Sequence, residues 1–298
     1  MKAHPISSER EETRPRLDPR QRLLRGVPVR ERRSELAGIS TGVLEGGNGP
    51  PIVLLHGPGE HAAKWLRVIP DLVTEHRVIV PDLPGHGTSA VEDGPVEAER
   101  VIAWLDALIE GTCDTSPVVV GQIIGGAIAA RHASRNGDRI AHLVLVDTLG
   151  LAPFQPAPEF GSALSEFIAQ PTGVTHDRLW ERCAFDLDRL QGQMGDAWTD
   201  LKAYNLDRAL APELGRTQER LMEQFGLPAI PPEELEQISV PTTLIWGRHD
   251  LATPLQVAEA ASENYGWPLH VIEGAADDPP LEQPEAFLKA LRTALERA

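Results

Sequence analysis

Residues 118–126 read Val-Val-Val-Gly-Gln-Ile-Ile-Gly-Gly and decide the fold class. The three valines predict a strand that is buried on both faces, and a glycine-containing turn follows them. A helix-forming stretch at 124–135 begins directly after this turn. A buried strand that passes into a helix through a tight turn indicates an α/β protein with a parallel sheet.

Short apolar runs lie on both sides of this stretch and have similar lengths. They predict further buried strands at 51–55, 77–80, 143–146, 242–246 and 269–272. Helical patterns lie between most of these runs, at 62–72, 96–109, 255–264 and 285–297. The alternation predicts right-handed crossovers and a mostly parallel, doubly wound sheet.

One insertion interrupts the alternation, and it defines the expected domains. Residues 151–235 are rich in helix formers and hold eight of the 14 aromatic residues. A helical insertion after the carboxyl end of a strand is expected to cover the functional end of the sheet, as a lid. The aromatics also fit a core of the insertion's own. We therefore expect a core over 29–150 and 236–298, with a helical cap over 151–235.

The N-terminal residues differ from the rest of the chain in charge. Residues 1–36 hold ten basic and six acidic residues, whereas the whole chain has a formal charge of −16. We expect residues 1–28 to form a flexible basic arm, mobile or lying on the acidic body. The overall charge disfavours partners that are nucleic acids or membrane surfaces.

Other features of the composition limit the class of protein. No apolar stretch reaches the length of a membrane span, and no apolar leader follows the N-terminus. The two cysteines fit a reducing compartment, and no cluster of metal-ligating residues is present in the sequence. We therefore expect a cytoplasmic protein with no cofactor and no metal, and leave open whether it forms a homodimer.

Five motifs in order resemble the α/β-hydrolase fold family, over essentially residues 29–298. They are His56-Gly57-Pro58-Gly59, Asp82-Leu83-Pro84-Gly85-His86-Gly87, Gly121–Gly126, Trp246–Asp250 and Glu282–Phe287. The resemblance implies an α/β-hydrolase fold with an eight-stranded, mostly parallel sheet and a helical lid. It also implies a serine nucleophile on the Gly-x-Ser-x-Gly turn, an acid and a histidine base.

The sequence departs from this catalytic pattern at two positions. Ile123 occupies the nucleophile position in the frame Gly121–Gly125, and its side chain cannot form a covalent intermediate. The acid position is kept as Asp250, but Asp277 stands where the histidine is expected. Asp250 and Asp277 form either an acid/base dyad that shares a proton or an unrelated pair in which Asp277 turns outward.

The expected oxyanion site also departs from the family pattern. The resemblance implies backbone N–H donors from Ile124 and from the residue after Gly57, but that residue is Pro58, which has no N–H. Gly59 is a substitute donor if the loop is displaced. His61 and Gln122 complete the candidate pocket residues; each also fits a purely structural role.

These departures predict a non-hydrolytic enzyme, such as a lyase, an isomerase or a cyclase. An apolar Ile123 below an aromatic-rich lid favours a small hydrophobic ligand or substrate. Two alternatives stay open at this point. One is a catalytically silent binding protein, and the other is a hydrolase of small esters or amides in which an aspartate activates water.

Overall fold

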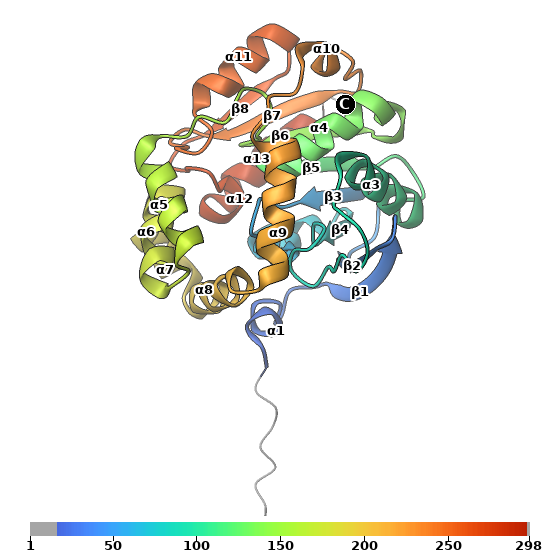
Figure 1. The fold of residues 1–298 in the computed structure, drawn as a ribbon. Helices are drawn as coiled ribbons and strands as arrows, with labels where there is room; N and C mark the ends of the chain where they lie inside the picture. The colour runs from blue at the N-terminus through green and yellow to red at the C-terminus, as the bar shows by residue number, and fades with distance from the viewer. Residues whose placement is uncertain (1–16, 297–298) are drawn as a thin grey trace, which may run out of the picture.

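An eight-stranded sheet forms the centre of the protein, in a computed structural model that describes residues 17–296 (Figure 1). The strand order is β1-β2-β4-β3-β5-β6-β7-β8, so β5 and β3 lie in the middle. The strands are β1 (Arg30–Leu36), β2 (Ile39–Gly46), β3 (Pro51–Leu55), β4 (Arg77–Pro81), β5 (Val118–Gln122), β6 (His142–Val146), β7 (Thr242–Gly247) and β8 (Leu269–Ile272).

The sheet is parallel from β4 to β8, and β2 is antiparallel to both of its neighbours. Side chains alternate between the two faces, as a strand requires. Along β3, Val53 and Leu55 enter one hydrophobic cluster, whereas Ile52 and Leu54 enter another. Both faces are therefore covered, which explains why these strands are continuous apolar runs. The predicted α/β fold with its eight-stranded, mostly parallel sheet is confirmed.

Helices cover the two faces as the clusters indicate. Helices α3 (Ala98–Thr112), α4 (Ile124–Asn136) and α11 (Leu255–Tyr265) pack on one face, and α2 (Ile69–Leu72) and α13 (Pro284–Leu295) pack on the other. The single helix expected over 62–72 is instead a 3₁₀-helix, η1 (Ala62–Arg67), followed by α2. Pro70 has no N–H and stands in the first turn of α2, which separates the two.

The insertion between β6 and β7 is helical and stands beside the core (Figure 1). It holds α5 (Pro158–Ala169), α6 (Gly173–Cys183), α7 (Leu187–Met194), α8 (Asp196–Ala209), α9 (Pro212–Leu221), the π-helical turn η3 (Met222–Gly226) and α10 (Pro232–Leu235). Trp180, Trp198 and Tyr204 of this cap share a hydrophobic cluster with Ala63 and Leu281 of the core. Some of the cap aromatics therefore form a joint core with the sheet domain.

Of the two arrangements expected for the N-terminal arm, mobile or lying on the body, the described residues 17–28 have the second. Residues 17–28 include a short helix, α1 (Pro19–Leu23), whose Leu23 enters the cluster between cap and core. A buried ion pair between Arg20 and Asp82 fixes this part of the arm to the acidic body. Residues 1–16 of the expected arm lie outside the described residues.

Within residues 17–296, no helix has both the length and the apolar character that a membrane span needs.

Candidate functional site

The turn between β5 and α4 places Ile123 in an unusual backbone conformation. Its φ is 49° and its ψ is −110°, a region that costs a β-branched residue free energy. The Ile123 N–H donates to Val146 O at 3.0 Å, and its carbonyl accepts from Leu149 N at 3.1 Å. The end of β6 therefore holds this turn in place, and the buried Ile123 side chain packs into the hydrophobic cluster on one face of the sheet.

Close packing around the turn requires glycine. A Cβ on Gly125 would lie 2.6 Å from Leu55 O, so the start of α4 touches the backbone of β3. A Cβ on Gly247 would lie 1.7 Å from Ala276 O. The loops after β7 and β8 therefore meet at the backbone, which brings Asp250 and Asp277 into the same region.

Only one of the two carboxylate oxygens of Asp250 accepts hydrogen bonds from the described residues. Its Oδ1 accepts from the N–H groups of Ala252 at 2.7 Å and Thr253 at 2.9 Å, while its buried Oδ2 has no hydrogen-bond partner among the described residues. Burial, and then the negative charge of Asp277, raises the pKa of Asp250 well above its usual value. These two aspartates are thus near enough to interact electrostatically.

Asp277 is buried, with 7% of its surface exposed, and does not turn outward. Its carbonyl accepts from Gln122 Nε2 at 3.0 Å, so the residue before Ile123 holds the Asp277 loop. Burial raises the pKa of Asp277 to about 7, although the nearby Lys64 ammonium acts in the opposite direction. The Asp277 carboxyl therefore changes its charge near neutral pH.

A second group of charged side chains lies next to Asp277. The Gln122 amide also donates to Asp278 Oδ1 at 3.1 Å, and Asp278 Oδ2 lies 3.0 Å from Lys64 Nζ. The Lys64 ammonium also forms an ion pair with Glu60. The other Glu60 oxygen, Oε2, accepts from Gly57 N–H at 2.8 Å. A chain of polar contacts thus joins the loop after β3 to the loop after β8.

Glu282 connects this region to the cap. Its Oε2 accepts from Phe185 N–H at 2.6 Å, and its Oε1 accepts from Ala276 N–H at 2.7 Å. Burial raises the pKa of Glu282 to about 8. The segment after α6 is therefore fixed directly to the loop that carries Asp277.

The remaining candidate residues are placed as follows. Ile124 opens α4, and the first amides of a helix have no acceptor within it. Pro58 follows Gly57 in the loop, and Gly59 has a φ of 72°. His61 packs edge-on against Tyr204 at 4.4 Å, and burial lowers its pKa to about 3, so it is neutral at ordinary pH.

One cavity among the described residues is lined by neither Ile123 nor Asp277. It measures about 870 Å³ and opens between α1, the loop after β4 and the cap helices α8 and α9. Ile123, Asp250 and Asp277 are all buried and none lines it.

Sequence reasoning missed four side chains of this site: Glu60, Lys64, Asp147 and Glu282. Glu60 and Lys64 carried a signal, because opposite charges four residues apart often form a pair. Asp147 is fully buried with a φ of 43°, and burial together with the charge of Asp250 raises its pKa. Residues 17–296 contain no group of three or more His, Cys, Asp or Glu side chains with a geometry for a metal ion.

The buried carboxyl of Asp277 predicts a pH-dependent contribution to stability. Its pKa is about 7 in the folded protein against an ordinary 3.8, so between these values the folded state binds the extra proton. The contribution of Asp277 to the free energy of unfolding therefore falls as the pH rises from about 4 to about 7. We expect Asp277→Asn to be more stable than the wild type, with an advantage that grows by about 1–3 kcal/mol between pH 5 and pH 8.

Urea denaturation at the two pH values measures this difference. The comparison with the variant is needed because buried histidines such as His56 and His86 have lowered pKa values and act in the opposite direction. Asp93→Asn, at an exposed position, is the matched control and is expected to follow the wild type. An equal advantage at both pH values would contradict a raised pKa at Asp277.

The comparisons with known proteins place the chain in a family. The model of the alpha/beta hydrolase fold family matches residues 50–277, which is more than half of the 298 residues. A 2-hydroxy-6-oxo-6-(2'-aminophenyl)hexa-2,4-dienoic acid hydrolase of Metapseudomonas resinovorans is 26% identical over 280 residues, covering 90% of this chain and 91% of that protein. A pimeloyl-acyl-carrier-protein methyl ester esterase of Aromatoleum aromaticum is 32% identical over 226 residues, covering 71% of this chain and 84% of that protein.

A solved structure agrees with these relatives. The 2-hydroxy-6-oxo-6-phenylhexa-2,4-dienoate hydrolase of a Rhodococcus species has a TM-score of 0.78 at 25% identity, and the match covers 91% of this chain and 99% of that chain. The prediction of a non-hydrolytic enzyme is wrong, because similar proteins are named as hydrolases and esterases. That prediction rests on the absence of a serine at position 123, and this absence alone does not exclude hydrolysis. By the family match and the shared fold, this chain belongs to the alpha/beta hydrolase fold family.

Proposed function

We propose that the protein is a hydrolase of a small ester, in which the Asp277 carboxylate activates a water molecule. In this proposal Ile123 stands at the position of the covalent nucleophile and Asp277 at the position of the histidine base. The relatives named above include a methyl ester esterase, which supports ester hydrolysis as the class of reaction. The proposal is carried by one observation: Asp277, whose backbone carbonyl accepts from Gln122 next to Ile123, has a buried carboxyl with a pKa raised to about 7.

Water is the nucleophile because Ile123 offers none. An isoleucine side chain has no atom that can form an acyl intermediate, and the pKa of the half-buried Cys183 thiol near Asp277 is raised, which disfavours the reactive thiolate. A general base works best when its pKa lies near the operating pH. Asp277 meets this condition because it is buried, whereas an exposed aspartate is far too weak a base.

The proposed steps conserve atoms and charge. Asp277 takes a proton from water while the water oxygen bonds to the carbonyl carbon of the ester, and the negative charge moves to the carbonyl oxygen. The Ile124 N–H is oriented to stabilise this oxyanion, because it is one of the free amides that open α4. The C–O bond to the alcohol then breaks, and protonated Asp277 returns its proton to the leaving alkoxide.

Isotope labelling under single-turnover conditions tests this mechanism. The protein in excess over a p-nitrophenyl or methyl ester, in H₂¹⁸O, is expected to place ¹⁸O in the acid product at the first turnover and none in the protein. A serine-directed phosphonate is expected to leave the protein mass unchanged. The appearance of ¹⁸O in Asp277 or Asp250, with unlabelled acid product, would identify a covalent aspartate mechanism instead. Absence of hydrolysis across an ester panel would refute the proposal.

A further inference from the structure

The carboxylate of Glu60 lies in a binding position built for an anion. Its Oε2 accepts from Gly57 N–H at 2.8 Å, and its Oε1 forms an ion pair with the Lys64 ammonium. Lys64 is itself anchored on the other side, because its Nζ lies 3.0 Å from Asp278 Oδ2. A backbone N–H and a buried ammonium together make charge-assisted hydrogen bonds, the strong kind in proteins.

This position adjoins the turn that carries Ile123. A Cβ on Gly57 would lie 2.9 Å from Glu60 Oε2 and 3.1 Å from Ile123 Cδ1. The Glu60 carboxylate and the Ile123 side chain therefore both lie close to Gly57. Asp277 belongs to the same region, since the charge of Lys64 acts on its carboxyl. A carboxylate that replaced Glu60 would thus be held within reach of the proposed reaction.

The side chains of Lys64 and Glu60 differ in how freely they can move. The Lys64 side chain is 6% exposed, and its ammonium lies 6.0 Å from the centre of the Trp180 ring. The Glu60 side chain is 19% exposed, and it follows Gly59 in a loop. Glu60 can therefore rotate toward solvent, whereas Lys64 stays in place between Asp278 and the cap.

We propose that the Lys64 ammonium and the Gly57 N–H bind a free carboxylate of the substrate, and that Glu60 occupies this position until the substrate displaces it. The exchange replaces one carboxylate with another, so the ammonium keeps its partner and no buried charge is left alone. The inference rests on the proposed function, because it names the class of ester: one that carries a second, free carboxylate group.

Binding of benzoate tests this inference without any need for turnover. Glu60→Ala removes the internal competitor, so we expect it to bind benzoate at least about tenfold more tightly than the wild type, as for a site otherwise filled nine-tenths of the time. Benzamide has the same shape without the charge, and is expected to bind equally to both proteins. Isothermal titration calorimetry measures both ligands. Glu92→Ala, at an exposed position, is the matched control and is expected to behave as the wild type.

A second variant identifies the ammonium as the binding group. Lys64→Met alone would leave Asp278 buried without its partner, so Lys64→Met is combined with Asp278→Asn to keep the charge balanced. Added to Glu60→Ala, this pair is expected to abolish the gain for benzoate. An equal gain for benzamide would mean that Glu60→Ala merely opens space, and no gain for benzoate would mean that Glu60 and Lys64 are a structural ion pair. Either result would overturn the inference, whereas lost ester hydrolysis with intact benzoate binding would count against the proposed function alone.

Discussion

Asp277→Asn is expected to lower the rate of ester hydrolysis by about 10²–10⁴-fold, the usual contribution of a general base. Asparagine keeps the size of the side chain but cannot accept the proton of water at neutral pH. In the wild type, kcat/KM is expected to rise with pH and to level off above about 7, because only the ionised Asp277 carboxylate acts as the base. The variant is expected to lose this rise together with the rate.

Steady-state kinetics on one p-nitrophenyl ester from pH 5 to pH 9 measures both effects. Asp93→Asn changes an exposed aspartate to the same residue and is expected to keep the wild-type rate and profile. Because the variant is expected to be the more stable protein at pH 8, a loss of activity there cannot be assigned to unfolding. A variant with the wild-type profile would exclude Asp277 as the base.

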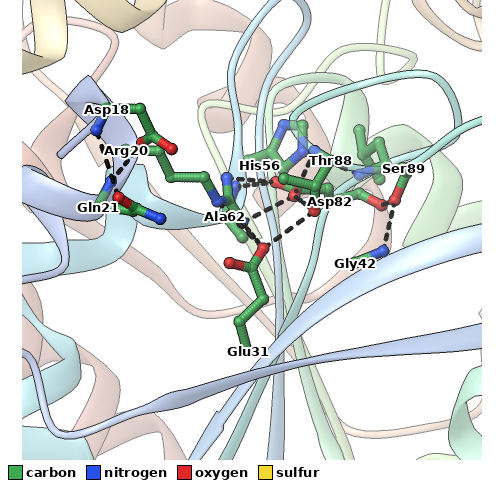
Figure 2. Close-up of polar contacts among 11 residues, drawn as sticks. Asp18, Arg20, Gln21, Glu31, Gly42, His56, Ala62, Asp82, Thr88 and Ser89 are labelled. Carbon is green, nitrogen blue, oxygen red and sulfur yellow. Dashed lines mark hydrogen bonds and ion pairs between the residues drawn. The ribbon is translucent and has the colours of Figure 1, made fainter. Parts of the chain in front are cut away.

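Arg20→Met is expected to lower the free energy of unfolding by about 3–5 kcal/mol, the usual cost of breaking a buried ion pair. Arg20 Nη2 lies 2.8 Å from Asp82 Oδ2 and 2.9 Å from Glu31 Oε1. Asp82 is fully buried and also accepts from Ala62 N–H at 2.6 Å and Thr88 N–H at 2.9 Å (Figure 2). Without Arg20, this carboxylate stays buried with no positive partner.

Arg22→Met, two residues along the same helix, is the matched control for this effect. Arg22 pairs with Asp200, but its side chain is 36% exposed, so we expect a loss of no more than about 1 kcal/mol. Urea denaturation compares the two variants. Asp82→Asn in the Arg20→Met background is expected to recover part of the loss, since it removes the unpaired charge. Similar losses for Arg20→Met and Arg22→Met would show that the Arg20–Asp82 ion pair contributes no more to the free energy of unfolding than the exposed pair of Arg22 does.

The central strands β3 to β7 were predictable because their residues are almost all buried, on both faces of the sheet. Such strands are continuous apolar runs, and their periodicity needs no knowledge of the neighbours. The split between η1 and α2 was harder to predict, because the pattern of apolar residues at 62–72 does not distinguish a 3₁₀-helix from an α-helix. The sequence left open whether residues 17–28 are mobile or packed on the body, because Arg20 finds its partner 62 residues away, at Asp82, and no local pattern shows this.

The motifs indicated which loops carry the candidate site, but not all of the side chains that meet there. The order of motifs located Ile123, Asp250 and Asp277, and the structure brings their loops together. Glu60 and Lys64 were missed because their importance depends on Asp278, which reaches them only when the loops after β3 and β8 meet. The predicted type of reaction was wrong because it rested on the missing serine. The sequence does not show how deeply a carboxyl is buried, although burial strongly affects its pKa.

The pairing of α1 with the cap has a consequence for synthesis on the ribosome. Arg22 Nε lies 2.6 Å from Asp200 Oδ1, a partner 178 residues later in the chain. At the usual 5–20 residues per second, roughly 10–35 s pass between the synthesis of these two residues. Throughout that interval Leu23 has no cap cluster to enter, because Trp198, Leu201 and Tyr204 do not yet exist. The α1 segment is thus made well before its partners in α8, and it remains without them while the 178 residues up to Asp200 are synthesised.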